Sequence, residues 1–231
     1  MARALPALLG ASLVAACSAP SGERPVYSRA LLEGPGEAQP SYIVARDLAL
    51  AKRARAVGEA AALAEFAAPD ARIDVASQGL GTWVPKTVWI SCDGRFAVSE
   101  GRFENSAGQV GDYVTTWRRS ASANTYRWLH RVAALDDPQP PPRTPRAPPS
   151  PDEIVVDGLI SADGHVADCR EKPAGIAPAA QAGEAIRSPD GTLVWRSAKT
   201  DETRTIEVDA WMEGRWSRVY ERRWPVAELG R

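Results

Sequence analysis

His130 is the side chain of this sequence that is best suited to acid–base chemistry. An imidazole takes up and releases a proton near neutral pH, and the carboxylates of Glu100 and Asp112 with the phenol of Tyr113 could complete an acid–base set. The competing interpretation is a histidine that only packs or hydrogen-bonds within a strand. We favour this packing role for His130, because a general base needs a positioned partner, and no residue spacing in the sequence identifies such a partner. The catalytic residues therefore stay unassigned, and the sequence favours a protein that is not an enzyme.

A second group of potential ligands lies between residues 163 and 169. It consists of Asp163, His165, Asp168 and Cys169. Their spacing matches no zinc or calcium motif, and Asp163-Gly164 is typical of a turn. The chain also lacks a nucleophile elbow, a zinc-binding His-Glu helix and a Walker motif. We therefore predict no metal site and no cofactor.

The first residues combine a positive head, an apolar run and two alanines before a cysteine. Arg3 precedes the run, which is too short to span a bilayer, and Cys17 follows it. This pattern resembles a bacterial lipoprotein signal, which implies a signal peptide at residues 1–16 and a lipid anchor on Cys17. Ser18 then implies transfer to the outer membrane, on its periplasmic side. The alternative is an ordinary secretory signal in which Cys17 is incidental.

Two cysteines remain if Cys17 carries lipid. An oxidising periplasm permits a disulfide between Cys92 and Cys169, which would connect distant parts of the sequence and stabilise the fold by about 4 kcal/mol. Two separate buried thiols are the alternative, because the distance between two cysteines cannot be derived from a sequence.

The composition is that of a folded protein without a general affinity for nucleic acid. Hydrophobic residues make up 44% of the chain and charged residues 25%, and the net charge is -1. No second apolar run is long enough to cross a bilayer. We therefore expect contact with the membrane through lipidated Cys17.

The pattern of apolar residues predicts helices first and strands later. Residues 17–40 are rich in proline and glycine, which is typical of a flexible tether. Ser41 can cap a helix with one apolar stripe. The stripe is formed by Ile43, Leu50, Ala54 and Val57. Gly58 marks a break, and a second helix is predicted from about residue 59 to residue 67.

From about residue 87 the sequence alternates as strands do. Strands are predicted at residues 87–92, 96–103, 113–117 and 126–132, and Asp93-Gly94 is a hairpin turn signal. Residues 136–152 are too rich in proline for a packed helix or central strand, so we predict an extended linker. Residues 153–231 are predicted to form a small β-rich region, with strands at about 154–160, 192–198, 204–213 and 215–224 and a loop-rich part between the first two.

The order of elements in residues 41–135 is similar to that of a known superfamily. The similarity rests on the helix leading to Gly58 with the stretch 66–71, on the strand at 92–101, and on the strand at 111–119 followed by Tyr126 and Trp128. It resembles the nuclear transport factor two-like superfamily, the ketosteroid isomerase and polyketide cyclase fold. The resemblance implies an α+β domain, in which N-terminal helices pack on a curved antiparallel sheet that forms a cone.

A cone of this kind would enclose an aromatic hollow. Alternation places Tyr113 and Trp117 on one face of their strand, and Trp128 and His130 on one face of the next strand. If these faces point inward, they line a pocket for a flat apolar molecule with a polar edge. The candidate pocket residues are Tyr113, Trp117, Trp128, His130 and Glu100.

Three functions fit these patterns, and a fold alone does not choose among them. The one we expect is an envelope lipoprotein that binds a small apolar molecule or a segment of an envelope protein. The second is an isomerase, dehydratase or cyclase that uses His130 with a carboxylate. The third is a structural envelope lipoprotein whose hollow is filled by its own side chains.

Overall fold

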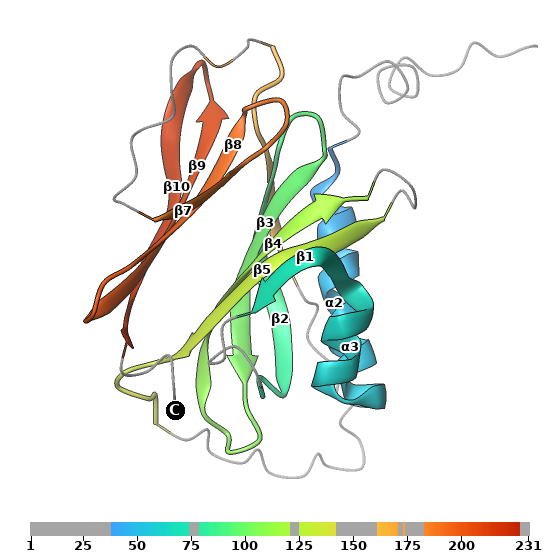
Figure 1. The fold of residues 1–231 in the computed structure, drawn as a ribbon, viewed down its shortest axis with the longest axis vertical. Coiled ribbons are helices and arrows are strands. Elements are labelled where there is room, and N and C mark those ends of the chain that lie inside the picture. The colour runs from blue at the N-terminus through green and yellow to red at the C-terminus, as the bar shows by residue number, and fades with distance from the viewer. Residues whose placement is uncertain are drawn as a thin grey trace, which may run out of the picture. The chain divides into compact units, whose positions relative to one another are not determined.

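Residues 38–73, 79–120, 125–141, 161–170, 173 and 183–226 are described here from a computed structural model. The predicted signal peptide, Cys17 with most of the tether, most of the proline-rich linker and the predicted strand at 154–160 lie outside these residues. The described part contains two helices, α2 and α3, and ten strands, β1 to β10. All of them except β6 are labelled in Figure 1.

Two consecutive helices begin the described part. α2 spans Pro40–Val57 and α3 spans Glu59–Phe66. Pro40 suits the first turn of α2, where a backbone N–H has no helical partner. Gly58 separates the helices with a φ of 90°, a conformation that glycine adopts at little cost. The buried side of α2 is formed by Ile43, Asp47, Leu50, Ala51 and Ala54.

The first sheet has six strands in the order β1-β5-β4-β3-β2-β6. Their bounds are Ala67–Ile73 for β1, Thr82–Ile90 for β2, Phe96–Glu104 for β3, Val110–Arg119 for β4, Tyr126–Leu135 for β5 and Asp163–Val166 for β6. β2 to β5 form an antiparallel meander at the positions where alternation predicts strands. The sequence predicts neither β1 nor β6, which pair in parallel with β5 and β2.

The second sheet has four antiparallel strands in the order β10-β9-β8-β7. Their bounds are Glu184–Arg187 for β7, Leu193–Lys199 for β8, Thr203–Met212 for β9 and Arg215–Pro225 for β10. The last three strands lie where the C-terminal meander is predicted, whereas β7 lies in a part that the sequence predicts as loop.

The predicted fold class, an α+β cone, is wrong, because the described part of the chain is mostly β, with two helices and two sheets. The reason is that β3, β4 and β5 carry buried side chains on both of their faces. A strand that is buried on both faces needs a packed layer on each side. A prediction that only one face of the sheet is buried therefore misses the second sheet.

The buried side chains form two hydrophobic cores. The helix-side core joins α2 and α3 to one face of the first sheet and includes Leu50, Trp83 and Trp117. The inter-sheet core joins residues of both sheets and includes Val114 from β4 and Trp195 from β8. The first sheet thus contributes side chains to both cores.

A β-bulge at Leu129 changes which side chains of β5 enter which core. Thr116 pairs with His130, and the next residue of β4 pairs with Trp128, so Leu129 has no partner on β4. One extra residue in a strand reverses the alternation beyond it. Trp128 accordingly packs in the helix-side core, whereas Val132 packs in the inter-sheet core.

Candidate functional site

The three aromatic residues predicted to line a hollow lie in the helix-side core. Tyr113 and Trp117 are fully buried, and Trp128 is 4% exposed. Trp117 Nε1 donates a hydrogen bond of 2.9 Å to Ser99 Oγ, and Trp128 Nε1 donates one of 2.9 Å to the carbonyl oxygen of Leu63. These rings are therefore packed and hydrogen-bonded within the protein itself.

The other two predicted pocket residues lie on the opposite face of the first sheet. The bulge turns His130 toward the second sheet, where its ring centroid is 4.9 Å from that of Trp195. Glu100 follows Ser99, which faces α2, and accepts a hydrogen bond of 2.6 Å from Thr87 Oγ1. The structure therefore divides the five predicted pocket residues between two faces and does not bring them together.

His130 has a carboxylate neighbour from the second sheet. Its Nε2 lies 3.4 Å from Oε1 of Glu184 on β7, and Arg72 contacts the same oxygen at 3.3 Å. Burial lowers the pKa of His130, and the negative charge of Glu184 opposes this shift. No local pattern reveals this pair, because its members lie on different sheets and far apart in the sequence.

The acid–base set suggested for His130 is divided as well. Asp112 lies 2.7 Å from Arg102 and 2.8 Å from Arg222, which joins the two sheets by an ion pair. Tyr113 points to the helix side, where its hydroxyl donates a hydrogen bond of 3.0 Å to Asp47.

Asp47 is the centre of a buried polar cluster beneath α2. Its side chain is fully buried and accepts hydrogen bonds from Trp83 Nε1 at 3.0 Å, Ser99 Oγ at 2.8 Å and the Tyr113 hydroxyl at 3.0 Å. Burial raises the pKa of Asp47, while the charge of Arg131 and the three hydrogen bonds oppose the shift.

Arg131 is the cation of this cluster and has no solvent exposure. Its guanidinium lies over the rings of Trp83 and Tyr113, at 4.4 and 4.8 Å from their centroids. Nη1 donates a hydrogen bond of 3.1 Å to Thr115 Oγ1. Nε and Nη2 are buried and have no hydrogen-bond partner among the described residues. These two nitrogens form one edge of the guanidinium, so a pair of parallel donors is left unused.

Glu59 contributes an unused acceptor near the same cation. It is the first residue of α3, and its Oε1 is buried without a hydrogen-bond partner in the part of the chain that the structure describes. Burial raises the pKa of Glu59, and this shift is opposed by the charge of Arg131 and by backbone hydrogen bonds from Leu80, Gly79 and Gly81. Buried polar atoms nearly always have partners, so these three atoms call for an explanation. A small molecule with an acceptor for Arg131 and a donor for Glu59 would satisfy them.

One signal in the sequence could have located this cluster. Asp47 stands four residues after Ile43 and three before Leu50, which is a position within the apolar stripe of α2. A charged residue in the buried stripe of a helix requires a partner inside the protein. Arg131 gives a weaker signal, because it follows the bulge and its face cannot be assigned from alternation.

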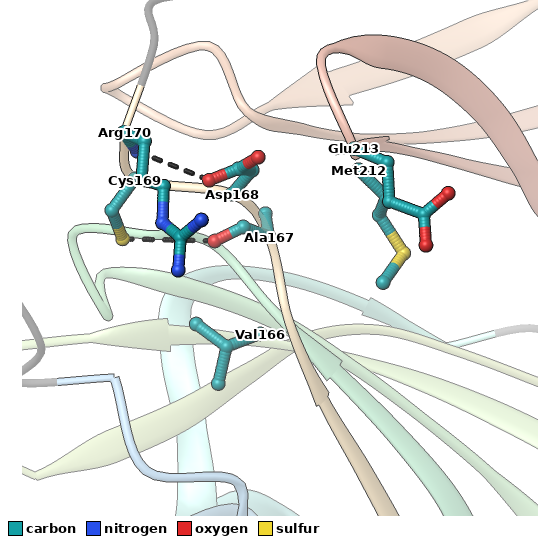
Figure 2. Close-up of a pocket in the computed structure, with 7 residues that line it drawn as sticks. All are labelled: Val166, Ala167, Asp168, Cys169, Arg170, Met212 and Glu213. Atoms are coloured by element: carbon teal, nitrogen blue, oxygen red, sulfur yellow. Dashed lines mark hydrogen bonds between the residues drawn. The ribbon is translucent and has the colours of Figure 1, made fainter.

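The structure joins Cys92 to Cys169 by a disulfide, with the Cα atoms 5.2 Å apart. Cys169 lines a pocket with a volume of about 340 Å³, drawn in Figure 2. The pocket is lined by Val166, Ala167, Asp168, Cys169, Arg170, Met212 and Glu213. Within the described ranges no group of three or more potential ligands could hold a metal ion, and Asp163, His165 and Asp168 form no such group.

No protein-family model matches this chain, and no curated protein is similar to it. The resemblance to the nuclear transport factor two-like superfamily therefore stays a prediction. Among the described residues, no helix is both long enough and apolar enough to cross a membrane.

Proposed function

We propose that this chain is a lipid-anchored binding protein of the bacterial envelope, and that it binds a small carboxylate at the polar cluster of Asp47, Arg131 and Glu59. The observation that carries the proposal is the set of three buried polar atoms without partners, two on Arg131 and one on Glu59. Each buried atom of this kind costs about 1–3 kcal/mol. A ligand that satisfies all three recovers that free energy on binding.

The chemistry of the three atoms defines the class of ligand. A carboxylate has two coplanar oxygens that match the parallel donors of an arginine edge. The acceptor on Glu59 requires a donor on the same ligand, such as a hydroxyl or an ammonium group. Asp47 and Glu59 already place two carboxyl groups around one guanidinium. A hydroxy acid or an amino acid therefore suits the cluster better than a bare anion does.

The proposed location rests on the first residues and agrees with the disulfide. The charged head, the apolar run and the small residues before Cys17 are typical of a lipoprotein signal. A disulfide between Cys92 and Cys169 is common in oxidising compartments and rare in the cytosol. Ser18 supports transfer to the outer membrane.

Ligand binding is tested on the full-length protein extracted from the envelope in detergent. The washed protein is denatured, and the released small molecules are identified by mass spectrometry. We expect one carboxylate in near-equal molar amount from the wild type, and its loss from Glu59→Ala and Arg131→Lys, because lysine lacks the paired donors. Glu65→Gln, also on α3 but exposed and paired with Arg53, is the control that should keep the ligand.

Two results would contradict binding at this cluster. One is the same set of released molecules from the wild type and the Glu59→Ala variant. The other is a high-resolution crystal structure in which only water lies between Arg131 and Glu59. Circular dichroism of each variant shows whether a loss of ligand has another cause, namely a loss of fold.

Anchoring is tested separately with Cys17→Ser. We expect the wild-type protein to incorporate radiolabelled palmitate and to partition into detergent, and the variant to do neither. An unlabelled wild-type protein would exclude the lipid anchor without affecting the proposed ligand site.

A structural role in the envelope is the second candidate. It is favoured by the packing of Tyr113, Trp117 and Trp128, which occupy the interior where a hollow for an apolar ligand was expected. Under this proposal no small molecule is released, and chemical cross-linking in intact cells recovers one partner protein of the envelope.

A further inference from the structure

The disulfide lies where segments of both sheets are joined by backbone hydrogen bonds. Just after β6, the N–H of Ala167 donates a hydrogen bond of 2.9 Å to the carbonyl oxygen of Ile90. The N–H of Asp168 donates one of 2.7 Å to the carbonyl oxygen of Trp211 on β9. Cys169 follows directly, so its backbone is held between a strand of the first sheet and a strand of the second.

The backbone at Cys92 is hydrogen-bonded to a turn of the second sheet, and Cys92 and Cys169 are both half-buried. It lies in the turn between β2 and β3, and its N–H donates a hydrogen bond of 3.0 Å to Thr192 Oγ1. The N–H of the next residue, Asp93, donates one of 2.7 Å to Asp190 Oδ2. Cys92 is not among the residues that line the pocket in Figure 2.

Cys169 has different surroundings, because its side chain forms part of the pocket wall. Its sulfur lies 3.6 Å from the carbonyl oxygen of Ala167. Arg170 lines the same pocket with a positive charge, Asp168 and Glu213 line it with negative charges, and Met212 adds an apolar side. A thiolate that enters the pocket thus meets Cys169 together with one cation and two carboxylates.

We propose that this disulfide exchanges with thiols at the sulfur of Cys169, and that the sulfur of Cys92 is the leaving group. A thiolate in the pocket attacks Cys169 Sγ and forms a new S–S bond. The bond between Cys169 and Cys92 breaks, its electron pair stays on Cys92 Sγ, and that thiolate takes a proton from water. In the reverse direction, the Cys92 thiolate attacks the mixed disulfide on Cys169 and releases the thiol.

The reverse direction describes how the disulfide is completed during folding. A dithiol oxidoreductase of the envelope would be held by a mixed disulfide to Cys169, and Cys92 would resolve it. The choice of sulfur follows from the pocket, since a thiolate must approach one of the two sulfurs along the S–S axis, and of the two cysteines Cys169 is the one that lines the pocket.

The first test uses the unmodified full-length protein. It is incubated with reduced glutathione, quenched with acid, alkylated and digested, and the position of glutathione is determined by mass spectrometry. We expect at least about ten times more glutathione on Cys169 than on Cys92. Equal amounts on both, or an excess on Cys92, would overturn the proposal.

Single-cysteine variants measure the same preference as rates. Cys92→Ser leaves the thiol of Cys169, and Cys169→Ser leaves that of Cys92. We expect the thiol in Cys92→Ser to react with oxidised glutathione roughly tenfold faster than the thiol in Cys169→Ser. The wild type, with its disulfide intact, gives the background rate without a free thiol on Cys92 or Cys169. The proposal fails if the two rates are equal or reversed while both variants keep the circular dichroism spectrum of the wild type.

A third comparison isolates the pocket charge. Arg170→Gln should slow the attack of glutathione on the wild-type disulfide several-fold at low salt, and the difference should shrink as salt is added. Arg95→Gln is the matched control, because Arg95 is an exposed arginine three residues after Cys92 and outside the pocket lining. Equal rates for the two variants would show that the charge of Arg170 does not promote the attack of glutathione.

Discussion

The carboxylate of Asp190 accepts a hydrogen bond of 2.7 Å from the backbone N–H of Asp93, so a turn of the second sheet is bound to a turn of the first. The two turns have the same internal bonds. In each, a serine hydroxyl donates to the aspartate two residues later at 2.6 Å, from Ser91 to Asp93 and from Ser188 to Asp190. The two aspartates differ, because the second carboxylate oxygen of Asp190 accepts a hydrogen bond from the other turn.

This difference predicts unequal effects of the same substitution. In Asp190→Asn an amide NH2 would face the N–H of Asp93, and the protein should lose about 1–3 kcal/mol in its free energy of unfolding. Asp93→Asn is the control, since the one oxygen that accepts from Ser91 and Arg95 can be kept. Urea unfolding measures both, and a similar loss in the two variants would show that the bond between the turns contributes little.

The pairing of Asp47 with Arg131 predicts energetic coupling. Arg131→Met leaves the buried carboxylate of Asp47 without its cation and should cost about 3–5 kcal/mol. In Asp47→Asn/Arg131→Met that charge is absent, so the double variant should be at least about 1 kcal/mol more stable than the sum of the single losses. The exposed pair of Arg53 and Glu65 should show coupling under about 1 kcal/mol. Strict additivity at the buried pair would contradict the arrangement.

His130 predicts a loss of stability in mild acid. Burial lowers its pKa from 6.5 in the folded protein, so the unfolded chain takes up this proton first as the pH falls. The unfolded state then binds more protons, and the free energy of unfolding decreases below pH 6.5 until the folded pKa is passed. His130→Gln should therefore show a shallower decrease between about pH 6.5 and 5 than the wild type. His165→Gln is the control, and a wild-type slope in His130→Gln would contradict the shift.

The bulge at Leu129 predicts that β5 tolerates the removal of this residue. Deletion of Leu129 removes the residue that has no partner on β4 and leaves Trp128 paired with Trp117 and His130 with Thr116. His130 and Val132 therefore stay on the inter-sheet side, and the variant should still unfold cooperatively. Leu129→Ala keeps the bulge and should cost about 2–5 kcal/mol while leaving a folded protein. A deletion variant without a cooperative thermal transition would show that β5 needs the bulge.

The local alternation of residues was sufficient to predict β2 to β5 and β8 to β10, but not to assign their faces. Around the bulge, the run Trp128-Leu129-His130 has large side chains at every position. The sequence pattern therefore does not show which of these residues is the extra one. β6 consists of four exposed residues without apolar alternation, which is why the sequence does not predict it.

The candidate site was only partly predictable for a different reason. Tyr113 lies on the helix side, but the cation above it comes from the strand after the bulge, and Glu59 comes from a helix start. Asp47 was detectable from its place in the helix stripe, as was the need for a buried partner. The identity of that partner depends on strand register, which single-sequence patterns do not determine.

β6 belongs to the first sheet although it follows the proline-rich stretch, and it pairs with β2, which is among the earliest strands of the chain. When the ribosome has finished β5, the neighbour that covers the β2 edge has not yet been made. The last cysteine is also missing at that moment. Completion of the amino-terminal sheet must therefore wait for residues from the carboxyl-terminal third, so the polypeptide reaches its final form only late in its synthesis.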